Sequence, residues 1–231
     1  MKKLLVSLMC MFSIEAYAQT NIQPGTYVTE EGWGTLAVTK DKNGTTNFDI
    51  GAIGANGHSC GIDGTIINNV ATVGDEPEMQ CVVKFKETPK AINVEPVSDE
   101  CRSYCGMRAS FDGEYLKLAS SCLPVNIDRS RKNFKKLYKE KKYEQALAVL
   151  EPVFNNCSNT IFWIDSGWIR NDLAVTYAKL QKFDACEKVL APLKADSKLS
   201  KDELEYPPTD AISYWSILQA TKTNLKLCNV K

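Results

Sequence analysis

The chain has 231 residues, of which 44% are hydrophobic, and its 28 lysine and arginine residues balance its 28 aspartate and glutamate residues. This composition is typical of a globular protein that can build a core, and it excludes a disordered or low-complexity chain. The formal net charge of zero argues against nucleic acid as a partner, because such binding relies on excess positive charge that neutralises phosphates.

Residues 1–18 have the pattern of a secretory signal peptide. Lys2 and Lys3 give a charged start, residues 4–14 form a short apolar run, and Ala16-Tyr17-Ala18 is a small-x-small cleavage site. The apolar run is too short to cross a bilayer of roughly 30 Å. We therefore expect a mature protein that begins at Gln19 and is located in the bacterial periplasm or is secreted.

The cysteine count predicts a disulfide framework. The chain has 9 cysteines, and Cys10 is removed with the signal peptide. The cysteines that remain in the mature chain are Cys60, Cys81, Cys101, Cys105, Cys122, Cys157, Cys186 and Cys228. An even number of cysteines in an exported chain is typical of paired cysteines, although eight cysteines permit about 105 pairings.

Charge divides the mature chain into two predicted domains. Residues 19–122 have 8 Lys/Arg against 14 Asp/Glu, a net charge of −6, whereas residues 123–231 have 18 against 13, a net charge of +5. We expect an antiparallel β-domain over 19–122 and a helical domain over 123–231. Opposite net charges favour attraction between the two domains.

The first domain alternates apolar and polar residues between recurring turn signals. Asn43-Gly44 and Asn68-Asn69 are expected to close hairpins because residues at such turns tolerate positive φ. Asp112-Gly113 is expected to close a third hairpin. The predicted strands cover residues 35–41, 45–50, 62–67, 70–73, 81–86, 91–97, 108–111 and 114–118. About eight short strands with tight turns predict a small β-barrel or sandwich.

The second domain contains an internal repeat. Residues 142–152 and 182–192, offset by 40, share a lysine, an aromatic residue, an acid, a small residue, Val-Leu and a proline. An amphipathic helix is predicted before each segment, at 128–140 and 161–180, and a last helix at 211–227. Helix, tight turn and second helix form the unit of an α-solenoid.

On these residues the second domain resembles the tetratricopeptide repeat family. The residues of the second unit that match the family's packing positions are Leu173, Ala174, Tyr177, Phe183, Cys186 and Leu190. The offset of 40 is longer than the family's usual 34 residues. The resemblance implies stacked antiparallel hairpins in which the first helix of each hairpin lines a concave groove.

Two disulfides are expected within these hairpins. Cys122 precedes the first helix and Cys157 follows its partner helix, so both lie at the same end of the hairpin. Cys186 lies on the fourth helix, and Cys228 ends the last helix, which is expected to pack against it. A closed loop of about 40 residues contributes about 3–4 kcal/mol in the chain-entropy treatment.

Two further disulfides are expected in the β-domain. Cys81 opens one strand and Cys101 follows the strand that pairs with it, which makes the two residues neighbours. Cys60 is then left to pair with Cys105 by elimination.

No catalytic or metal-binding motif stands out in the sequence, which favours a non-enzymatic protein without a cofactor. His58 is the only histidine, and its neighbour Cys60 is expected to be oxidised, so a structural or surface role is preferred over nucleophilic chemistry. Cys101 and Cys105 do not supply the four ligands of a zinc site. Residues 51–57 are rich in glycine but lack the Lys-Ser/Thr of a phosphate-binding loop, and a flexible β-loop is expected there.

One charged cluster is a candidate binding surface. The residues that crowd the first helix and its exit are Arg129, Arg131, Lys132, Lys135, Lys136, Lys139, Lys141 and Lys142. The tetratricopeptide resemblance implies that Arg131, Lys135 and Lys139 face the groove, joined by Asn171 and Lys179. Such a groove would bind an acidic segment or a peptide carboxylate. The simpler alternative is a solvated basic face, or one that docks the acidic β-domain.

The first domain is similar in type and size to the small disulfide-bearing β-domains of bacterial lysozyme inhibitors. This resemblance implies an exported inhibitor of, or immunity protein against, a cell-wall hydrolase. The loop that enters the hydrolase cleft would be 51–58 or 99–105. The alternative function is a periplasmic scaffold whose helical groove binds acidic peptides or partner proteins.

The signal and the even cysteine count lead to a first prediction. The mature protein should begin at Gln19 and contain no free thiol. Intact-mass measurement after thiol alkylation of the folded protein tests both statements. Two or more alkylated cysteines in the folded protein would contradict the disulfide framework.

Overall fold

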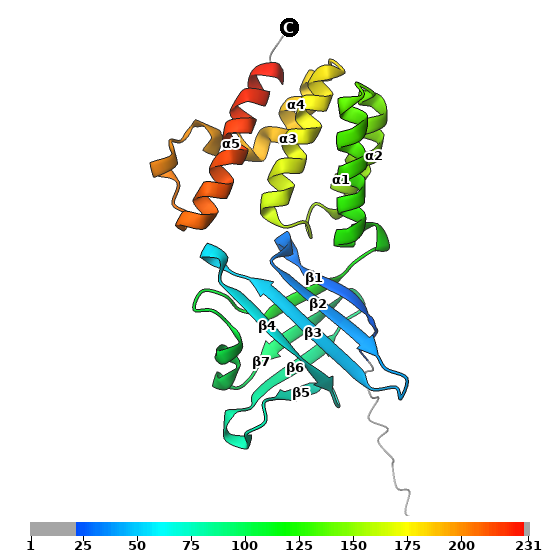
Figure 1. Ribbon diagram of the computed structural model, residues 1–231, viewed down its shortest axis with the longest axis vertical. Helices are drawn as coiled ribbons and strands as arrows, with labels where there is room; N and C mark the ends of the chain where they lie inside the picture. Colours follow the sequence, from blue (N-terminus) through cyan, green and yellow to red (C-terminus); the bar gives the residue numbers. More distant parts are fainter. Residues whose placement is uncertain (1–21, 229–231) are drawn as a thin grey trace, which may run out of the picture.

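The computed structural model describes residues 22–228. The predicted signal peptide, its cleavage site and Cys10 lie outside the described residues. A β-domain and a helical domain are stacked end to end along the long axis of the molecule (Figure 1). The last strand ends at Lys117 and the first helix begins at Pro124, so the change from strands to helices falls where the sequence pattern changes.

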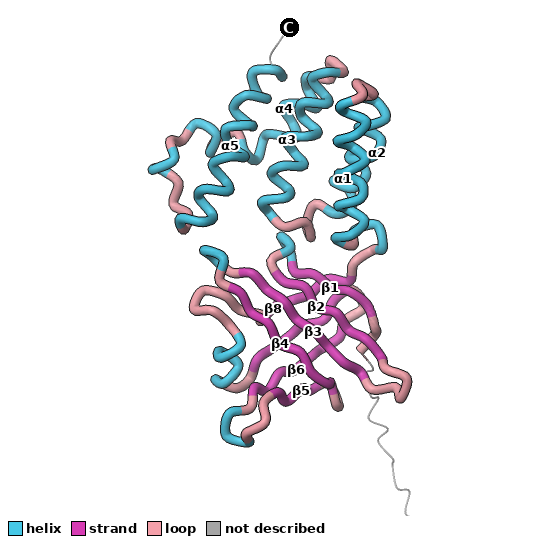
Figure 2. The backbone as a smooth tube through the Cα atoms, in the orientation of Figure 1, coloured by secondary structure: helices cyan, strands magenta, loops and turns pink. Residues whose placement is uncertain are grey.

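The β-domain is one antiparallel sheet that is nearly closed into a barrel (Figure 2). Its strands are β1 (Gly25–Thr29), β2 (Gly34–Lys40), β3 (Thr46–Ile53), β4 (Ser59–Ile66), β5 (Val70–Val73), β6 (Cys81–Glu87), β7 (Ala91–Pro96) and β8 (Gly113–Lys117). The strand order is β4-β3-β2-β1-β8-β7-β6-β5. The two edge strands, β4 and β5, are joined by the single bridge between Ile67 and Val70. The expected total of about eight antiparallel strands is confirmed, but β1 was not among the predicted strands.

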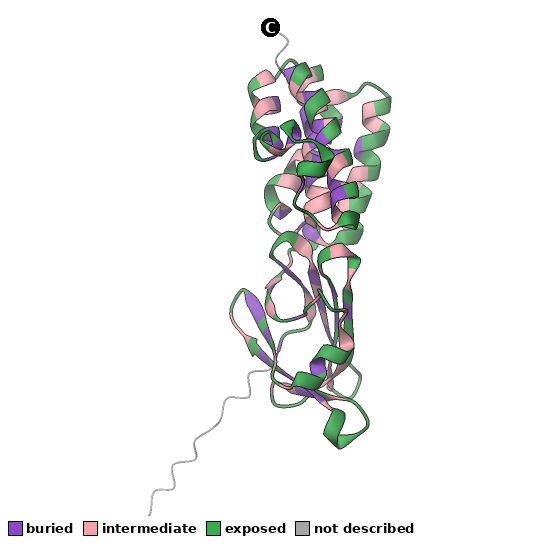
Figure 3. Cartoon of the chain, turned by 90° about the vertical axis from the view of Figure 1, so that its left-hand side faces the viewer, coloured by how far each residue is buried: buried purple, intermediate pink, exposed green. Residues whose placement is uncertain are grey.

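The interior of the barrel is filled by alternate residues of each strand. Leu36, Ile50, Val83 and Tyr115 are fully buried there. Because successive side chains of a strand point to opposite faces, this alternation places the apolar residues inside and the polar residues in solvent. Burying each large apolar side chain contributes about 1.5–3 kcal/mol. Buried segments occur in both domains (Figure 3).

Two of the three predicted hairpin turns are confirmed. Asn68 and Asn69 both have positive φ, at 53° and 64°, between β4 and β5, and Gly44 has φ 84° between β2 and β3. The third prediction was wrong, because residues 108–111 form no strand and Gly113 starts β8. Phe111 is instead buried in the barrel, where its carbonyl accepts a hydrogen bond of 2.9 Å from the Tyr115 hydroxyl.

The helical domain consists of two antiparallel hairpins and a last helix. The helices are α1 (Pro124–Lys139), α2 (Tyr143–Cys157), α3 (Trp163–Lys179), α4 (Phe183–Leu190) and α5 (Pro208–Cys228). Helix α1 begins at Pro124, before the predicted start, because proline is well tolerated in the first turn, where its missing N–H has no helical partner. Helix α2 continues through Pro152 to Cys157.

The two hairpin turns have the same backbone geometry at positions 40 apart. Lys141 and Gln181 have φ values of 60° and 57°, and each is followed by a lysine whose N–H closes the turn. The Lys142 N–H donates to the Leu137 carbonyl at 3.0 Å, and the Lys182 N–H donates to the Tyr177 carbonyl at 2.9 Å. The sequence repeat therefore corresponds to a repeated turn.

The structure holds four disulfides, two in each domain. The bonded pairs are Cys60–Cys105, Cys81–Cys101, Cys122–Cys157 and Cys186–Cys228. These are the four pairs expected from the sequence. The first two join the β7–β8 connection to the barrel. Cys122–Cys157 joins the turn before α1 to the end of α2, and Cys186–Cys228 joins α4 to the end of α5.

The turn after β1 carries the first contact between the domains. The Glu31 N–H donates to the Asn159 carbonyl at 2.8 Å. At Gly32, whose φ is 69°, an added Cβ would lie 2.5 Å from the Phe162 backbone nitrogen. A side chain at this position would therefore collide with the helical domain, and only glycine allows the close approach.

The tip of the β3–β4 connection carries the second contact. The Asn56 N–H donates to Asp210 Oδ2 at 2.8 Å, and the Thr209 N–H donates to Asn56 Oδ1 at 3.2 Å. The expectation that residues 51–57 form a flexible loop was wrong, because β3 extends to Ile53 and the tip docks on the start of α5. For the same reason, 51–58 is not a loop that projects freely toward a partner.

A second prediction concerns the crosslink of α5. Replacing both Cys186 and Cys228 by alanine should reduce the free energy of unfolding by roughly 2–5 kcal/mol, because the unfolded chain regains conformational freedom. Urea unfolding measures the loss, and limited proteolysis should release α5 before the barrel is cut. Cleavage of both domains at the same rate would show instead that the two domains unfold as one cooperative unit.

Candidate functional site

The exposed face of α1 is strongly basic. Within residues 22–228 the structure contains two salt bridges, Arg131–Asp165 at 2.6 Å and Lys142–Glu140 at 2.8 Å. The other lysines of α1 are exposed and take part in neither salt bridge: Lys132, Lys135, Lys136 and Lys139. The basic cluster predicted from the sequence is therefore a solvated surface along most of α1.

Arg131 differs from the other cations of this helix because it is largely enclosed. Its side chain is 17% exposed, and Nη1 donates to Asp165 Oδ1 at the start of α3. Its Nε is buried and makes no hydrogen bond within the described part of the chain. Arg131 thus connects α1 to α3, and its charge is already compensated by a carboxylate of the same domain.

Asp172 on α3 faces the same side of α1. Burial raises the pKa of its carboxyl group above the usual value, and the nearby charges of Arg131 and Lys135 act in the opposite direction with a smaller effect. Of the predicted groove residues on α1, Arg131 is therefore paired with Asp165, and Arg131 and Lys135 both lie near Asp172. This arrangement weakens the positive potential that an acidic peptide would meet.

Asn171 is not available to a partner, which corrects its expected place in the groove. It is 4% exposed, and its amide nitrogen donates to Thr221 Oγ1 and to the Gly167 carbonyl, both at 3.0 Å. Its amide oxygen accepts a hydrogen bond of 2.9 Å from Asn224 Nδ2. Asn171 is buried because α5 packs against α3 at this position, and its hydrogen bonds link the two helices.

The structure therefore brings together only part of the predicted binding set. Lys135 and Lys139 are exposed on α1, and Lys179 is exposed in the last turn of α3. Arg131 and Asn171 serve contacts within the helical domain. The exposed lysines alone remain as a surface for an acidic ligand.

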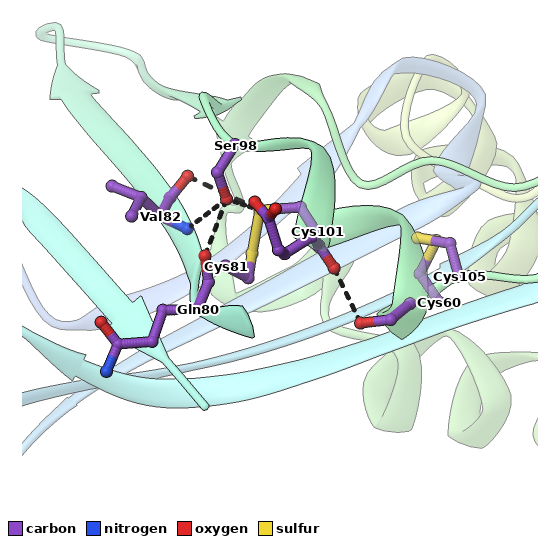
Figure 4. Close-up of a disulfide and its surroundings, with 9 residues drawn as sticks. Cys60, Gln80, Cys81, Val82, Ser98, Cys101 and Cys105 are labelled. Atoms are coloured by element: carbon purple, nitrogen blue, oxygen red, sulfur yellow. Dashed lines mark hydrogen bonds between the residues drawn. A yellow bond between two sulfur atoms is a disulfide. The ribbon is translucent and has the colours of Figure 1, made fainter. Parts of the chain in front are cut away.

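A second candidate site is the connection between β7 and β8, which we call the stapled loop (residues 98–108). Its first part is held against β6 by Ser98, whose hydroxyl accepts the Val82 N–H at 3.0 Å and donates to the Gln80 carbonyl at 2.9 Å. Three residues later, Cys101 is bonded to Cys81 at the start of β6 (Figure 4). This end of the loop is fixed by both a hydrogen-bonded side chain and a disulfide.

The second part of the stapled loop is fixed to β4. Cys105 is bonded to Cys60, and the Gly106 N–H donates to the Ser59 carbonyl at 2.8 Å. Gly106 also packs against the ring of His58, where an added Cβ would lie 2.8 Å from Nδ1. His58 supports the loop by packing, in agreement with the structural role expected for it.

Between and beyond these attachments the loop is open to solvent. Met107 is 93% exposed, the largest exposed fraction among the large hydrophobic side chains of the described residues. The other exposed residues of the stapled loop are Asp99, Glu100, Arg102, Ser103 and Arg108. The loop predicted from the sequence covered 99–105 and did not include Met107. Met107 lies two residues after Cys105, the second cysteine of the loop.

Comparison of the chain with protein-family models, with curated proteins and with solved structures found no match. Within residues 22–228, every helix falls short of the length or apolar character that a membrane crossing requires. The same residues contain no group of three or more histidine, cysteine, aspartate or glutamate side chains arranged to hold a metal ion. The exposed surfaces of α1 and of the stapled loop are therefore the evidence on which a function can be proposed.

A third prediction follows from the raised pKa of Asp172. Between the unfolded pKa of about 3.9 and the higher folded pKa, the folded protein binds more protons than the unfolded chain. Stability should therefore fall as pH rises through this window. Asp172→Asn should make the protein more stable than wild type at pH 7, and the difference should vanish below about pH 4.

Urea unfolding from pH 3.5 to pH 7 measures this difference. Asp165→Asn is the matched control on the same helix, and it should not stabilise the protein because it removes the salt bridge to Arg131. An Asp172→Asn variant that is less stable than wild type at pH 7 would contradict the assignment.

Proposed function

We propose that this protein is an exported, non-enzymatic protein-binding protein that inhibits, or gives immunity to, a cell-wall hydrolase through its stapled loop. The single observation that supports this most is the combination of two disulfides with Met107, which is 93% exposed on the loop they hold. An exposed apolar side chain on a fixed backbone is the kind of anchor that fills a pocket on a partner protein.

The rigidity of the loop matters because binding costs conformational entropy. A loop that must be ordered on binding loses about 0.5–1.5 kcal/mol for each side chain that is immobilised, in addition to the backbone cost. The stapled loop is attached at Ser98, Cys101, Cys105 and Gly106 in the free protein. Most of its ordering cost is therefore met during folding, which is how small protein inhibitors reach high affinity.

The charges of the loop suit the cleft of a glycan-cleaving enzyme. Such enzymes use a pair of carboxylates beside the bond they cleave. Arg108 follows Met107 directly and Arg102 is exposed on the same loop, so either arginine could meet a carboxylate when the methionine enters the cleft. The proposed mechanism is occlusion of the cleft without chemistry by the inhibitor.

A fourth prediction tests the loop directly. Met107→Asp should weaken inhibition of the sensitive hydrolase by at least about tenfold, because a charge replaces the apolar anchor. The assay is the rate at which a panel of lysozymes and other peptidoglycan hydrolases clears a suspension of bacterial cell walls. Met79→Asp is the matched control, since Met79 is 63% exposed on the same domain but lies outside the loop.

Equal effects of Met107→Asp and Met79→Asp, or none in either, would contradict a role of the stapled loop. A pull-down from periplasmic extract supplies the independent result, because the loop hypothesis expects a hydrolase among the captured proteins. Circular dichroism of each variant excludes misfolding as the cause of lost inhibition.

The alternative function, a scaffold that binds acidic peptides on the helical domain, is favoured by the exposed lysines of α1. The double variant Lys135→Glu with Lys139→Glu should abolish this binding and remove its salt dependence. Lys198→Glu with Lys201→Glu changes the charge equally at exposed positions on another face. A loss seen only in the α1 variant, with inhibition unchanged, would favour the scaffold over the inhibitor.

A further inference from the structure

A pocket of about 380 Å³ lies between the two domains and is separate from the surfaces discussed so far. No residue of the stapled loop and no lysine of α1 lines it. Its wall in the β-domain comes from the turn after β1 and from the end of β3. Its wall in the helical domain comes from the start of α3 and the segment before α5. The volume is within the range of small-molecule sites, which often lie between domains.

Aromatic rings form one wall of this interdomain pocket. Trp163 and Tyr206 are stacked, with ring centroids 5.5 Å apart and an angle of 14° between the planes. Tyr214 packs against both rings, and its hydroxyl donates to Asp196 Oδ2 at 2.6 Å, which fixes the cluster. Tyr206 is still 44% exposed. Part of the Tyr206 side chain therefore remains open to a ligand.

The charged residues that line the pocket are both acidic. They are Glu31 from the β-domain and Asp210 from the helical domain, and no lysine, arginine or histidine lines the pocket. Asp210 uses Oδ2 to accept the Asn56 N–H. Neither carboxylate takes part in the two salt bridges of the described residues. The pocket thus combines aromatic rings with two carboxylates that take part in neither salt bridge of the described residues.

The backbone places Glu31 in this position at some cost. Its φ is 59°, in the left-handed region that residues other than glycine, asparagine and aspartate seldom adopt. Its N–H is bonded to Asn159 of the other domain. The pKa of the Tyr206 hydroxyl is raised, mainly by burial and to a smaller extent by the negative charges of Asp196 and Glu31. Glu31 and Tyr206 are therefore close to one another in the lining of the pocket.

We propose that the interdomain pocket binds a guanidinium group, such as an arginine side chain carries. A planar cation can stack on the Tyr206 face and donate forked hydrogen bonds to a carboxylate at the same time. A neutral saccharide could also stack on the rings, but it would leave both carboxylates without a counter-charge. The ammonium group of lysine would compensate the charge without stacking.

Arginine amide and citrulline amide are the probes for this site, because the two molecules differ chiefly in charge. Arginine amide should bind in the millimolar range and should shift the indole N–H signals of Trp33 and Trp163 in NMR spectra. The signals of Trp168 and Trp215, which do not line the pocket, should stay in place. Citrulline amide should bind at least about fivefold more weakly, and added salt should weaken the binding of arginine amide.

Glu31→Gln should weaken the binding of arginine amide by about fivefold. Glu30→Gln removes the same charge from the neighbouring exposed residue and should leave this affinity unchanged. A blocked Gly-Arg-Gly peptide that binds more tightly than arginine amide would assign the site to a peptide-borne arginine. Equal or weaker binding of the peptide would assign it to a free guanidinium compound.

Equal affinity for arginine amide and citrulline amide would overturn the proposal, as would binding of an N-acetylglucosamine trimer alone. So would the absence of any binding. No hydrolase is needed in these measurements, so their outcome is independent of the proposed inhibition. Near-ultraviolet circular dichroism confirms that each variant keeps its fold.

Discussion

Two of the disulfides fix the connection between β7 and β8, most of whose residues lie outside the buried core of the barrel. The connection between β7 and β8 contains no strand, yet Cys101 and Cys105 attach it to β6 and β4. Small domains bury a modest fraction of their surface, so connections of this kind gain little from packing alone. In the chain-entropy treatment each crosslink contributes about 3 kcal/mol or more. The position of the stapled loop, and the binding that we assign to it, depend on these two bonds.

The contact between the domains relies on backbone hydrogen bonds. Glu31 and Asn56 both have positive φ, and both donate a backbone N–H across the boundary, to Asn159 and Asp210. The opposite net charges of the two domains predict ion pairs between them, but both salt bridges of the described residues lie within the helical domain. Directional bonds at two tips fix the orientation of the domains more closely than a diffuse attraction would. They also give the interdomain pocket its shape.

The sequence predicted all the α-helices, all the strands except β1, and the four disulfide pairs, because periodicity, turn residues and cysteine positions act locally. It failed where a residue's role depends on a distant segment. Phe111 was assigned to a strand, but it belongs to the connection before β8 and is buried in the barrel, where the Tyr115 hydroxyl donates a hydrogen bond to its carbonyl. Asn171 was placed in a groove because helical periodicity cannot tell a face that packs on α5 from one open to solvent. The loop at Asn56 was predicted to be free because nothing local shows that α5 begins beside it.

The three candidate sites differ in charge, and this restricts which ligand each of them can bind. The α1 face is basic and the interdomain pocket is acidic, so a ligand that suits one is repelled by the other. The stapled loop has exposed residues of both signs, among them Glu100 and Arg102, and an apolar side chain at Met107. Its exposed charges balance, so its affinity should rest mainly on shape and apolar contact, and salt should weaken only the single arginine–carboxylate contact proposed for it. A salt-resistant complex would thus involve the loop, whereas a salt-sensitive one would involve the α1 face or the pocket, according to the charge of the partner.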